Sequence, residues 1–350
     1  MALQLAKYLF QLSVPPPSYF AHLVRAQLFT KPPLPSTPYT DKTIIITGGN
    51  RGLGLEAVRH YVRLGAARVI IACRSTESGE AAKASITLPP DSNTVIEVWP
   101  LDLCSFESVK AFCRRAQKEL DRLDVLLLNA GVAMGDVEFS EGYETTITTN
   151  VISTFFVAVK LLPLLRRTGI ERNEESRLTI VASEAHYFTA FKERHEDDIF
   201  EAFKRGDGKY YWGDRYGVSK LLDVLLAREL AEKLDQRAGG AGKIPIIVNS
   251  VNPGLCGATS LFRSVPWFVG IVLTFLSLIM ARSSDQGARV LMAAAEGGRE
   301  THGKYIDSGK VHDPSPFVLS DEGKKAGEKA WDELMEILEK IEPGSTFILG

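Results

Sequence analysis

A tyrosine and a lysine lie four positions apart in the stretch DRYGVSKLLDVLLAREL, residues 214–230. Apolar residues recur there at helical spacing, which predicts an amphipathic helix. Residues four apart share one face of a helix, so Tyr216 and Lys220 are expected to meet. The pattern also occurs by chance as an ordinary surface pair, and the rest of the sequence has to decide between the two interpretations.

The chemistry of such a pair is proton transfer. A phenol has an ordinary pKa of about 10. An ammonium at about 4 Å, with an effective dielectric of about 20, favours the phenolate by up to about 4 kcal/mol. That energy would lower the pKa of the phenol by up to about 3 units, towards neutrality. Tyr216 is therefore a candidate general acid and base, with Lys220 as the group that adjusts it.

A glycine-rich loop, TGGNRGLGLEAVRHYVRLGA, follows directly on the apolar run TIIIT at residues 43–47. Gly48, Gly52 and Gly54 would let the backbone turn tightly and approach a pyrophosphate closely. The helix that begins there would direct its positive end at that anion. A strand before the loop and an amphipathic helix after it favour a dinucleotide site over a purely structural turn.

The elements that must position these residues alternate along the chain. Apolar β-rich runs are separated by helical patterns, which indicates a parallel sheet with crossover helices, and the continuously apolar runs indicate strands buried on both faces. The predicted strands are residues 43–47, 68–73, 95–101, 125–130, 177–183, 245–251 and 304–307, and the predicted helices are 53–65, 105–121, 142–167, 216–236 and 284–297. We expect one Rossmann-type, doubly wound α/β domain at residues 41–318 with a mostly parallel seven-stranded sheet.

Both ends of the chain are expected to extend beyond this domain. Residues 1–40 combine an amphipathic stretch, with Leu5, Leu9 and Leu12 on one side, with the Pro-rich connector KPPLPSTPY. The amphipathic stretch is too short before its prolines to span a bilayer, so it would pack on the domain or lie on a membrane surface. Residues 319–350 predict a charged amphipathic helix with Ser320 as its N-cap.

Composition excludes several classes of function. The 350 residues carry a formal net charge of −2, which gives no electrostatic footprint for nucleic acid. The four cysteines form no C-x-x-C pair and no metal-ligand cluster; they are Cys73, Cys104, Cys113 and Cys256. This usage is typical of reduced thiols in a cytoplasmic protein, and no metal is expected.

The motifs as a set resemble the short-chain dehydrogenase/reductase family. The T-G-x-x-x-G-x-G spacing matches at the glycine loop, and the later matches come in chain order: LDL (101–103), LNAG (128–131), TTNVIS (148–153), IVASEAH (180–186), YGVSK (216–220) and VNPG (251–254). The resemblance covers about residues 42–310. The charged and aromatic insertion at 191–215 is similar to that of retinol-dehydrogenase-like members and of fungal natural-product reductases.

The resemblance implies a role for each matched residue. Tyr216 would transfer the proton, Ser183 would bind the substrate oxygen and Asn150 would hold a water for proton relay, while Lys220 would also bind the nicotinamide ribose. The cofactor-binding residues would be Gly48, Asn50, Arg51, Gly52, Leu53, Gly54, Arg74, Asp102, Asn129, Tyr216, Lys220, Pro253 and Gly254, with Asp102 at the adenine.

For some of these residues a structural interpretation stays open. Ser183 could serve only as a cap at a strand end, and Asn150 only as a helix-packing residue. His186 and Tyr187 are interpreted as loop packing.

The end of the second strand bears on the choice of nicotinamide cofactor. It reads IIACRS and offers no carboxylate for the ribose 2′-hydroxyl of NAD. Arg74 follows it, and Arg51 lies in the glycine loop; two guanidinium groups suit a 2′-phosphate. The sequence thus predicts NADP(H). The alternative is that Arg74 only caps a surface turn.

An uncharged stretch, SVPWFVGIVLTFLSLIMA, lies between Arg263 and Arg282 and has the length of a membrane span. A span there would separate the strands at 245–251 and 304–307, although both belong to one sheet, so we exclude it. In the family that the chain resembles, this position forms the substrate lid, here at about residues 257–283. An apolar lid predicts a bulky, hydrophobic substrate, or contact with a membrane surface.

Together these observations predict an NADP(H)-dependent oxidoreductase. It would interconvert a carbonyl and an alcohol on a lipophilic small molecule, such as a retinoid-like or steroid-like compound or a secondary-metabolite ketone or aldehyde. Peripheral membrane contact, and a homodimer formed through the helices at 142–167 and 216–236, are further expectations. The alternative function is a catalytically idle NADP-binding sensor or scaffold on the same fold.

Overall fold

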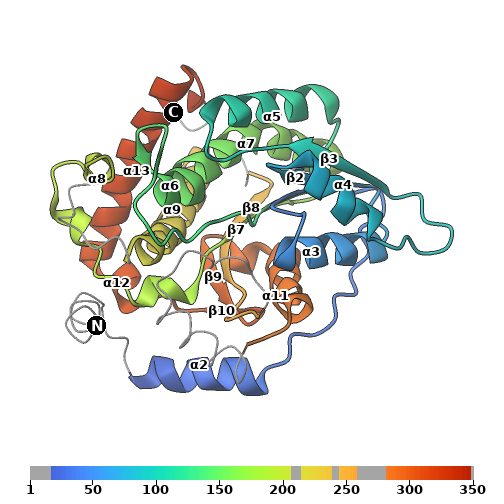
Figure 1. The fold of residues 1–350 in the computed structure, drawn as a ribbon, viewed down its shortest axis with the longest axis horizontal. Coiled ribbons are helices and arrows are strands. Elements are labelled where there is room, and N and C mark those ends of the chain that lie inside the picture. Colours follow the sequence, from blue (N-terminus) through green and yellow to red (C-terminus); the bar gives the residue numbers. More distant parts are fainter. Residues whose placement is uncertain (1–16, 206–213, 239–243, 258–280, 348–350) are drawn as a thin grey trace.

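A mostly parallel sheet forms the centre of the computed structural model, which describes residues 17–205, 214–238, 244–257 and 281–347 (Figure 1). In chain order its strands are β1 (Thr43–Thr47), β2 (Arg68–Cys73), β3 (Val95–Pro100), β4 (Val125–Leu128), β7 (Ser176–Val181), β8 (Ile246–Asn252), β9 (Lys304–Asp307) and β10 (Lys310–His312). They lie in the order β10-β9-β8-β7-β4-β1-β2-β3. This is the predicted doubly wound arrangement.

The predicted number of strands is wrong by one. The seven predicted strands run parallel, and β10 adds an antiparallel eighth at the edge. Only three residues long, β10 follows β9 through a turn in which Ser308 and Gly309 have positive φ. So short a strand leaves no periodicity in the sequence to detect. A separate two-stranded hairpin consists of β5 (Phe139–Ser140) and β6 (Tyr143–Glu144).

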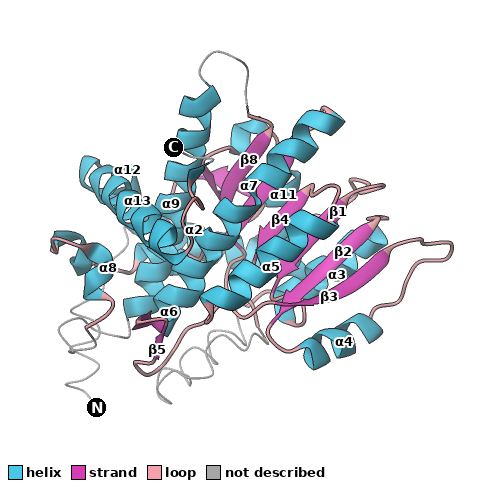
Figure 2. Ribbon diagram, turned by 90° about the horizontal axis from the view of Figure 1, so that it is seen from above, coloured by secondary structure: helices cyan, strands magenta, loops and turns pink. Residues whose placement is uncertain are grey.

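Helices cover both faces of the sheet (Figure 2). The long ones are α3 (Gly52–Arg63), α4 (Thr76–Ala84), α5 (Phe106–Glu119), α7 (Ser153–Arg172), α9 (Arg215–Ala238) and α11 (Ser284–Glu296). Helices α3 and α11 pack on one face, and α5, α7 and α9 on the other, so that two apolar cores lie on opposite sides of the strands. Helix α4, which the sequence pattern did not predict, packs on β2 and β3.

Shorter helices and turns connect these elements. They are α6 (Thr145–Ile147), the π-helical turn η1 (Thr148–Ile152), the 3₁₀ turns η2 (Glu184–Tyr187), η3 (Lys192–His195) and η6 (Arg299–Thr301), and the helices α8 (Ile199–Ala202) and α12 (Pro316–Leu319). Helices α6 and α7 with η1 form one continuous apolar stretch, Thr145–Arg172, long enough to cross a membrane. Of its most apolar window, 89% is buried inside the molecule, so this stretch is the central core helix.

Helix α2 (Pro17–Phe29) precedes the domain and runs along the lower edge of the molecule in Figure 1. It was not predicted, and the predicted amphipathic residues Leu5, Leu9 and Leu12 lie outside the described residues. Contacts far along the chain hold α2: His22 Nε2 lies 3.0 Å from Asp307 Oδ2, and the ring of Tyr19 stacks on Tyr187 at 3.9 Å. An extended segment at 30–39 then leads to β1, as the Pro-rich sequence predicted.

Helix α13 (Asp321–Ile341) closes the other end of the chain. Ser320 is its N-cap, as predicted, and accepts a hydrogen bond from the amide of Gly323 at 3.0 Å. The apolar side of α13, which includes Trp331 and Leu334, is buried against α9. The catalytic candidates on α9 therefore belong to a helix that is enclosed between the sheet and α13.

The predicted lid, about residues 257–283, lies almost wholly outside the described residues. Its two ends are described and meet each other. Gly257 donates a backbone hydrogen bond to Arg282 at 2.9 Å, and Cys256 pairs with Arg282 in a parallel bridge.

Candidate active site

The glycine loop turns from β1 into α3 as the sequence predicted. Gly48 and Gly52 have φ values of +66° and +54°, which favour glycine. A Cβ atom on Gly54 would lie only 2.4 Å from the carbonyl oxygen of Gly48, so no side chain fits there. A Cβ on Gly52 would meet nothing within 4 Å, so that glycine borders open space. A loop with close backbone contact inside and room outside is suited to hold a phosphate.

Asn129, at the end of β4, fixes this loop from the side. Its backbone amide donates to the hydroxyl of Thr47 at 2.9 Å, and its side-chain amide donates to the carbonyl oxygen of Thr47 at 2.9 Å. The next amide, from Ala130, also donates to the Thr47 hydroxyl, at 3.0 Å. The N-A-G turn thus joins β4 to the glycine loop and holds both in a fixed relation.

Asn150 lies in the π-helical turn η1 and is 1% exposed. Its Oδ1 accepts from the amide of Val132 at 2.8 Å, and its Nδ2 donates to the Val132 carbonyl and to the Ser219 hydroxyl, both at 2.9 Å. Single π turns are frequent at functional sites. These hydrogen bonds join η1 to the turn after β4 and to α9. They agree with the interpretation of Asn150 as a helix-packing residue, and the proposed water relay stays a prediction.

Tyr216 and Lys220 lie on one face of α9, as predicted, and the Lys220 ammonium is 5.9 Å from the centre of the Tyr216 ring. The Ser183 side chain lies close enough to the Tyr216 hydroxyl to lower the pKa of that phenol by hydrogen bonding. Ser183 also caps η2, where its hydroxyl accepts from the amide of Ala185 at 3.1 Å. Both interpretations of Ser183 are therefore compatible, because one oxygen makes both contacts.

The expected net lowering of the Tyr216 pKa is wrong for the chain alone. Burial is the largest influence and raises the pKa of this phenol above its ordinary value. The Lys220 charge and the hydrogen bond with Ser183 lower it, as the sequence suggested, but they do not outweigh burial. The sequence-based estimate counted the attraction of the ammonium and left out the cost of burying a phenolate.

Asp223 is a contact of Lys220 that sequence reasoning missed. The Lys220 ammonium donates to Asp223 Oδ2 at 2.9 Å and to the carbonyl oxygen of Val181 at 2.8 Å. Both side chains of this ion pair are almost fully buried. The signal was present, since Asp223 is the acidic residue three positions after Lys220 in the otherwise apolar run LLDVLL.

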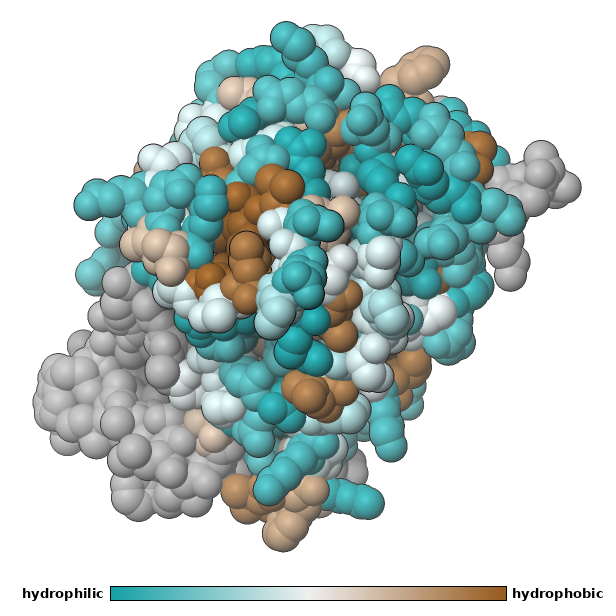
Figure 3. All heavy atoms as spheres, turned by 90° about the vertical axis from the view of Figure 1, so that its right-hand side faces the viewer, coloured by the Kyte–Doolittle hydropathy of each residue, from teal (hydrophilic) through white to brown (hydrophobic). Residues whose placement is uncertain are grey.

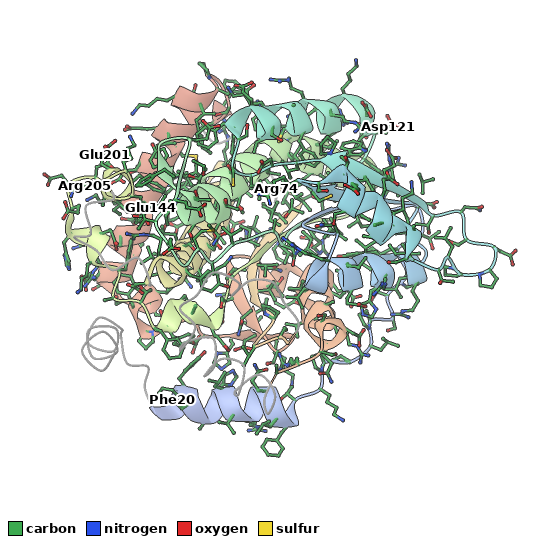
Figure 4. All side chains as sticks on the ribbon, viewed as in Figure 1. Phe20, Arg74, Asp121, Glu144, Glu201 and Arg205 are labelled. Carbon is green, nitrogen blue, oxygen red and sulfur yellow. The ribbon has the colours of Figure 1, made fainter. Side chains whose placement is uncertain are left out.

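The end of the site that would bind adenosine lies after β2 and β3. Arg74 follows β2, is exposed, and forms no ion pair with any described residue (Figure 4). Ser75 beside it caps α4. Asn50 of the glycine loop donates to the Ser78 hydroxyl at 2.9 Å, and Asp102 accepts from the amide of Cys104 at 3.0 Å in the turn after β3. The exposed Arg51 lies at the N-cap of α3.

The Pro253–Gly254 turn after β8 is braced by side chains that sequence reasoning did not connect to it. Arg282 donates to the carbonyl oxygen of Pro253 at 2.9 Å. Gln27 of α2 donates to the carbonyl oxygen of Leu255 at 3.3 Å. Gly254 has a φ of +81°, and a Cβ on it would lie 2.8 Å from Gln27 Oε1, so this turn also requires glycine.

Leu53 of the glycine loop packs on α11. A Cβ on Gly287 of α11 would lie 2.4 Å from Leu53 Cδ2, which shows how closely the two helices approach.

The interpretation of His186 and Tyr187 as packing residues is confirmed. The backbone carbonyl of Ser183 is 2.7 Å from His186 Nδ1, and His186 Nε2 accepts from the amide of Ser315 at 3.0 Å. Burial lowers the pKa of His186 to about 4, so this ring is neutral at physiological pH. The Tyr187 hydroxyl donates to the carbonyl oxygen of Asp313 at 2.6 Å.

Fold and site together define a nicotinamide-dependent oxidoreductase of the Rossmann type, and the chain belongs to the short-chain dehydrogenase/reductase family. The family profile described as short chain dehydrogenase matches residues 42–190. The short chain dehydrogenase/reductase dmxR8 of Cryptosporiopsis sp. is 39% identical over 92% of this chain and 98% of its own length. The short-chain dehydrogenase anuD of Penicillium roqueforti is 40% identical over 93% of this chain and 84% of its own length. Both relatives are fungal, in agreement with the predicted branch.

Solved structures with the same fold are less similar in sequence. An NADP complex of Pseudomonas aeruginosa RhlG has a TM-score of 0.56 at 22% identity, over 77% of this chain and 95% of that one. A 3-ketoacyl-(acyl-carrier-protein) reductase of Brucella melitensis complexed with NADH has a TM-score of 0.57 at 20% identity, over 77% of this chain and 96% of that one. These similarities support the fold and leave the choice of dinucleotide to the residues of the site.

The residues of this chain fit a nicotinamide dinucleotide. The glycine loop excludes side chains at Gly54 and borders open space at Gly52, which suits a pyrophosphate. Arg74 is exposed directly after β2, and the Lys220 ammonium lies near the Tyr216 ring; by the family resemblance these two would be the groups at the adenosine and nicotinamide riboses. A dinucleotide bound there would supply or accept a hydride.

Proposed function

We propose that the chain is an NADP(H)-dependent oxidoreductase that interconverts a carbonyl and an alcohol on a bulky, hydrophobic compound. The observation that carries this proposal is the position of Tyr216 on one face of α9 with the buried Lys220, whose ammonium lies 5.9 Å from the centre of its ring, together with the Ser183 side chain, which lowers the pKa of the phenol. A phenol so placed can give a proton to a carbonyl oxygen as hydride reaches the carbon, and can take it back in the reverse direction. Ser183 would then donate a hydrogen bond to the same oxygen and orient it.

Replacement of Tyr216 by Phe tests the chemistry. The variant keeps the ring and loses the proton, so turnover should fall by about 10²–10⁴-fold while NADPH affinity, measured by fluorescence titration, stays within about threefold. The control is Tyr187→Phe, which removes a hydroxyl that binds Asp313 outside the proposed chemistry. Undiminished turnover of Y216F would exclude Tyr216 as the proton donor, whereas a wild type that binds NADPH and turns over no carbonyl would favour the alternative, a dinucleotide-binding sensor or scaffold.

The preference for NADP(H) rests on Arg74. Its guanidinium is exposed, follows a strand that carries no terminal carboxylate, and forms no ion pair with a described residue, so it can meet a 2′-phosphate. A charge-assisted hydrogen bond contributes about 1.5–3 kcal/mol, which corresponds to about 10–150-fold in affinity. Arg74→Asp should therefore weaken NADPH by at least about tenfold and leave NADH equal or better. Arg166→Asp, on the outer side of α7, is the control, and an unchanged preference in R74D would contradict the proposal.

The substrate class rests on the sequence between Arg263 and Arg282, which is apolar and uncharged. In a panel of carbonyl compounds we expect NADPH consumption with polycyclic or isoprenoid ketones and aldehydes and little with small polar sugars. The fungal relatives make a secondary-metabolite ketone or aldehyde a rational first choice for the panel. A preference for sugars would refute this part of the proposal.

Contact with a membrane surface is the second part of the proposal, and α2 supports it. The side chains of Phe20, Val24 and Leu28 are each more than 40% exposed and form one stripe, and Phe29 is 77% exposed. The basic residue Arg25 is also exposed, and α2 contains no acidic residue. Apolar side chains also reach the surface at the lower edge of Figure 3, the edge along which α2 lies. An apolar stripe with a cation fits an anionic lipid surface.

Sedimentation with vesicles of phosphatidylcholine and phosphatidylserine tests this surface. The double variant Phe20→Ser, Phe29→Ser should bind the vesicles at least about tenfold more weakly than the wild type. The control is a second double variant, Leu88→Ser, Val95→Ser, which changes two other exposed apolar residues of the domain. Equal binding of all three proteins, or no binding of the wild type, would exclude α2 as the contact.

A further inference from the structure

Asp223 is a buried carboxylate that the proposed function leaves without a part. It lies on α9 one turn after Lys220, and its side chain is 1% exposed. An isolated carboxylate at such a place would be costly, and the Lys220 ammonium at 2.9 Å compensates it. Its second oxygen, Oδ1, has no hydrogen-bond partner among the described residues. Among the described residues, Lys220 is thus the hydrogen-bond partner of this carboxylate.

The ion pair fixes the direction of the ammonium. Lys220 Nζ has three N–H donors, of which one binds Asp223 and one binds the carbonyl oxygen of Val181 at 2.8 Å. The atom also lies beside the turn after β4, because a Cβ on Gly131 would be 3.6 Å from it and 3.2 Å from Asn150 Oδ1. Two of the donors are therefore held by the protein interior, and the third is left for the side of Asn150 and Tyr216.

The same pair changes the electrostatics at Tyr216. The Lys220 charge favours the phenolate, whereas the Asp223 charge opposes it. Burial raises the pKa of Asp223 to about 6 in spite of the lysine, so this group is a carboxylate at neutral pH. Although burial disfavours the charge on Lys220, Asp223 and Tyr216 together raise the pKa of its ammonium. The phenol thus faces a dipole in place of a single positive charge.

We propose that Asp223 is a positioning residue, whose carboxylate anchors the Lys220 ammonium and partly neutralises it, and so sets the pH range in which Tyr216 exchanges its proton. This inference rests on the proposed function and extends it to a residue that does not touch the substrate.

Other charged groups lie near Tyr216, and a substitution of Asp223 leaves them unchanged. Glu184 of η2 acts on Tyr216 in the same direction as Asp223, and it is coupled to Asp307 and Arg282. Arg215, next to Tyr216, binds Glu144 of β6 and Glu193 of η3. Asp214 accepts from the Thr189 hydroxyl at 2.8 Å, and burial raises its pKa to about 7. From η1 and β7, the groups that approach Lys220 are Asn150 and the Val181 carbonyl, which do not titrate. All of these stay in place when only Asp223 changes.

The test is the titration of Tyr216 itself, followed by NMR of protein labelled at the tyrosine ring carbon that bears the hydroxyl. It is recorded on the complex with NADP⁺ and no substrate, and the Tyr216 signal is the one absent from Tyr216→Phe. Asp223→Asn keeps the size of the side chain and an oxygen that can accept from Lys220, but removes the charge. We expect its Tyr216 to titrate about 0.5–1.5 pH units lower than in the wild type.

Two further variants control the experiment. Asp223→Glu keeps the carboxylate and should titrate within about 0.3 units of the wild type, whereas Glu232→Gln removes an exposed charge from the same helix and should shift nothing. The pH profile of kcat should move with the NMR titration. A Tyr216 signal that titrates at the same pH in D223N and wild type, at a higher pH in D223N, or in neither protein overturns the role of Asp223. Failure of the wild type to bind NADP⁺ or to turn over any carbonyl would overturn the proposed function itself.

Discussion

Loss of one buried arginine should destabilise the whole catalytic end of α9. Arg215 is 4% exposed and donates two hydrogen bonds to the Glu144 carboxylate, from Nε at 2.6 Å and from Nη2 at 3.1 Å. Its Nη1 binds Glu193, which is 3% exposed. This single side chain therefore joins the hairpin, the insertion after Ser183 and the start of the helix that carries Tyr216.

Arg215→Met retains most of the volume and removes the cation. Two carboxylates would then stay at a buried place without the guanidinium that binds them, and breaking a buried pair in this way costs about 3–5 kcal/mol. Since a folded domain is stable by only about 5–15 kcal/mol, the free energy of unfolding in urea, followed by tryptophan fluorescence, should fall by a large part of its total.

The triple variant Arg215→Met, Glu144→Gln, Glu193→Gln separates charge from packing. It removes the charges of all three residues together, so it should recover at least about half of the loss. Arg59→Met, which removes a surface pair with Glu56, should cost about 1 kcal/mol or less. A loss below about 1 kcal/mol in R215M, or a triple variant no more stable than R215M, would refute this reasoning.

Three further outcomes are expected. Gly54→Ala should weaken NADPH binding at least about tenfold in a fluorescence titration, because the new Cβ would lie 2.4 Å from the Gly48 carbonyl oxygen; unchanged affinity would exclude this loop as the phosphate site. Burial and the neighbouring Asp307 raise the pKa of Glu184 to about 7, so its contribution to stability is complete below pH about 4.5 and is lost as the pH rises through 7. Glu184→Gln should therefore lose less stability between pH 5 and pH 8 than the wild type, and parallel curves would contradict this. Because α13 covers α9, light scattering should give the mass of one chain, 38.5 kDa, whereas twice that mass would support the homodimer predicted from the sequence.

The fold could be predicted from the sequence because its strands are buried on both faces. A short, continuously apolar run such as TIIIT indicates a strand covered on both faces, as at the centre of a parallel sheet. All five of its residues are buried in the structure. Elements at the periphery left weaker signals. Helix α4 begins at a serine cap and contains Gly79, which packs closely against Val98. A glycine at this buried position interrupts the apolar spacing by which a helix is recognised in a sequence.

The candidate site could be predicted in part. Residues within one motif, such as Tyr216 and Lys220, are related by helix geometry alone, so their spacing was sufficient. The brace of Gln27 on the Pro253–Gly254 turn joins positions more than 200 apart and follows no local rule. The pKa of Tyr216 was predicted in the wrong direction because the extent of its burial depends on the packed structure, and the spacing of Tyr216 and Lys220 in the sequence does not reveal it.

The contact between His22 and Asp307 spans 285 positions of the chain, and this has a consequence for synthesis. At about 5–20 residues per second, the ribosome needs roughly 15–60 s to produce Asp307 after α2 has emerged. During that interval the strand that receives α2 does not yet exist, and both sides of this helix stay accessible. A nascent chain would therefore be most accessible to chaperones, or to a bilayer, at its beginning. The contacts that Gln27 and Arg282 make with the turn at Pro253–Leu255 would be among the last parts of the enzyme to form.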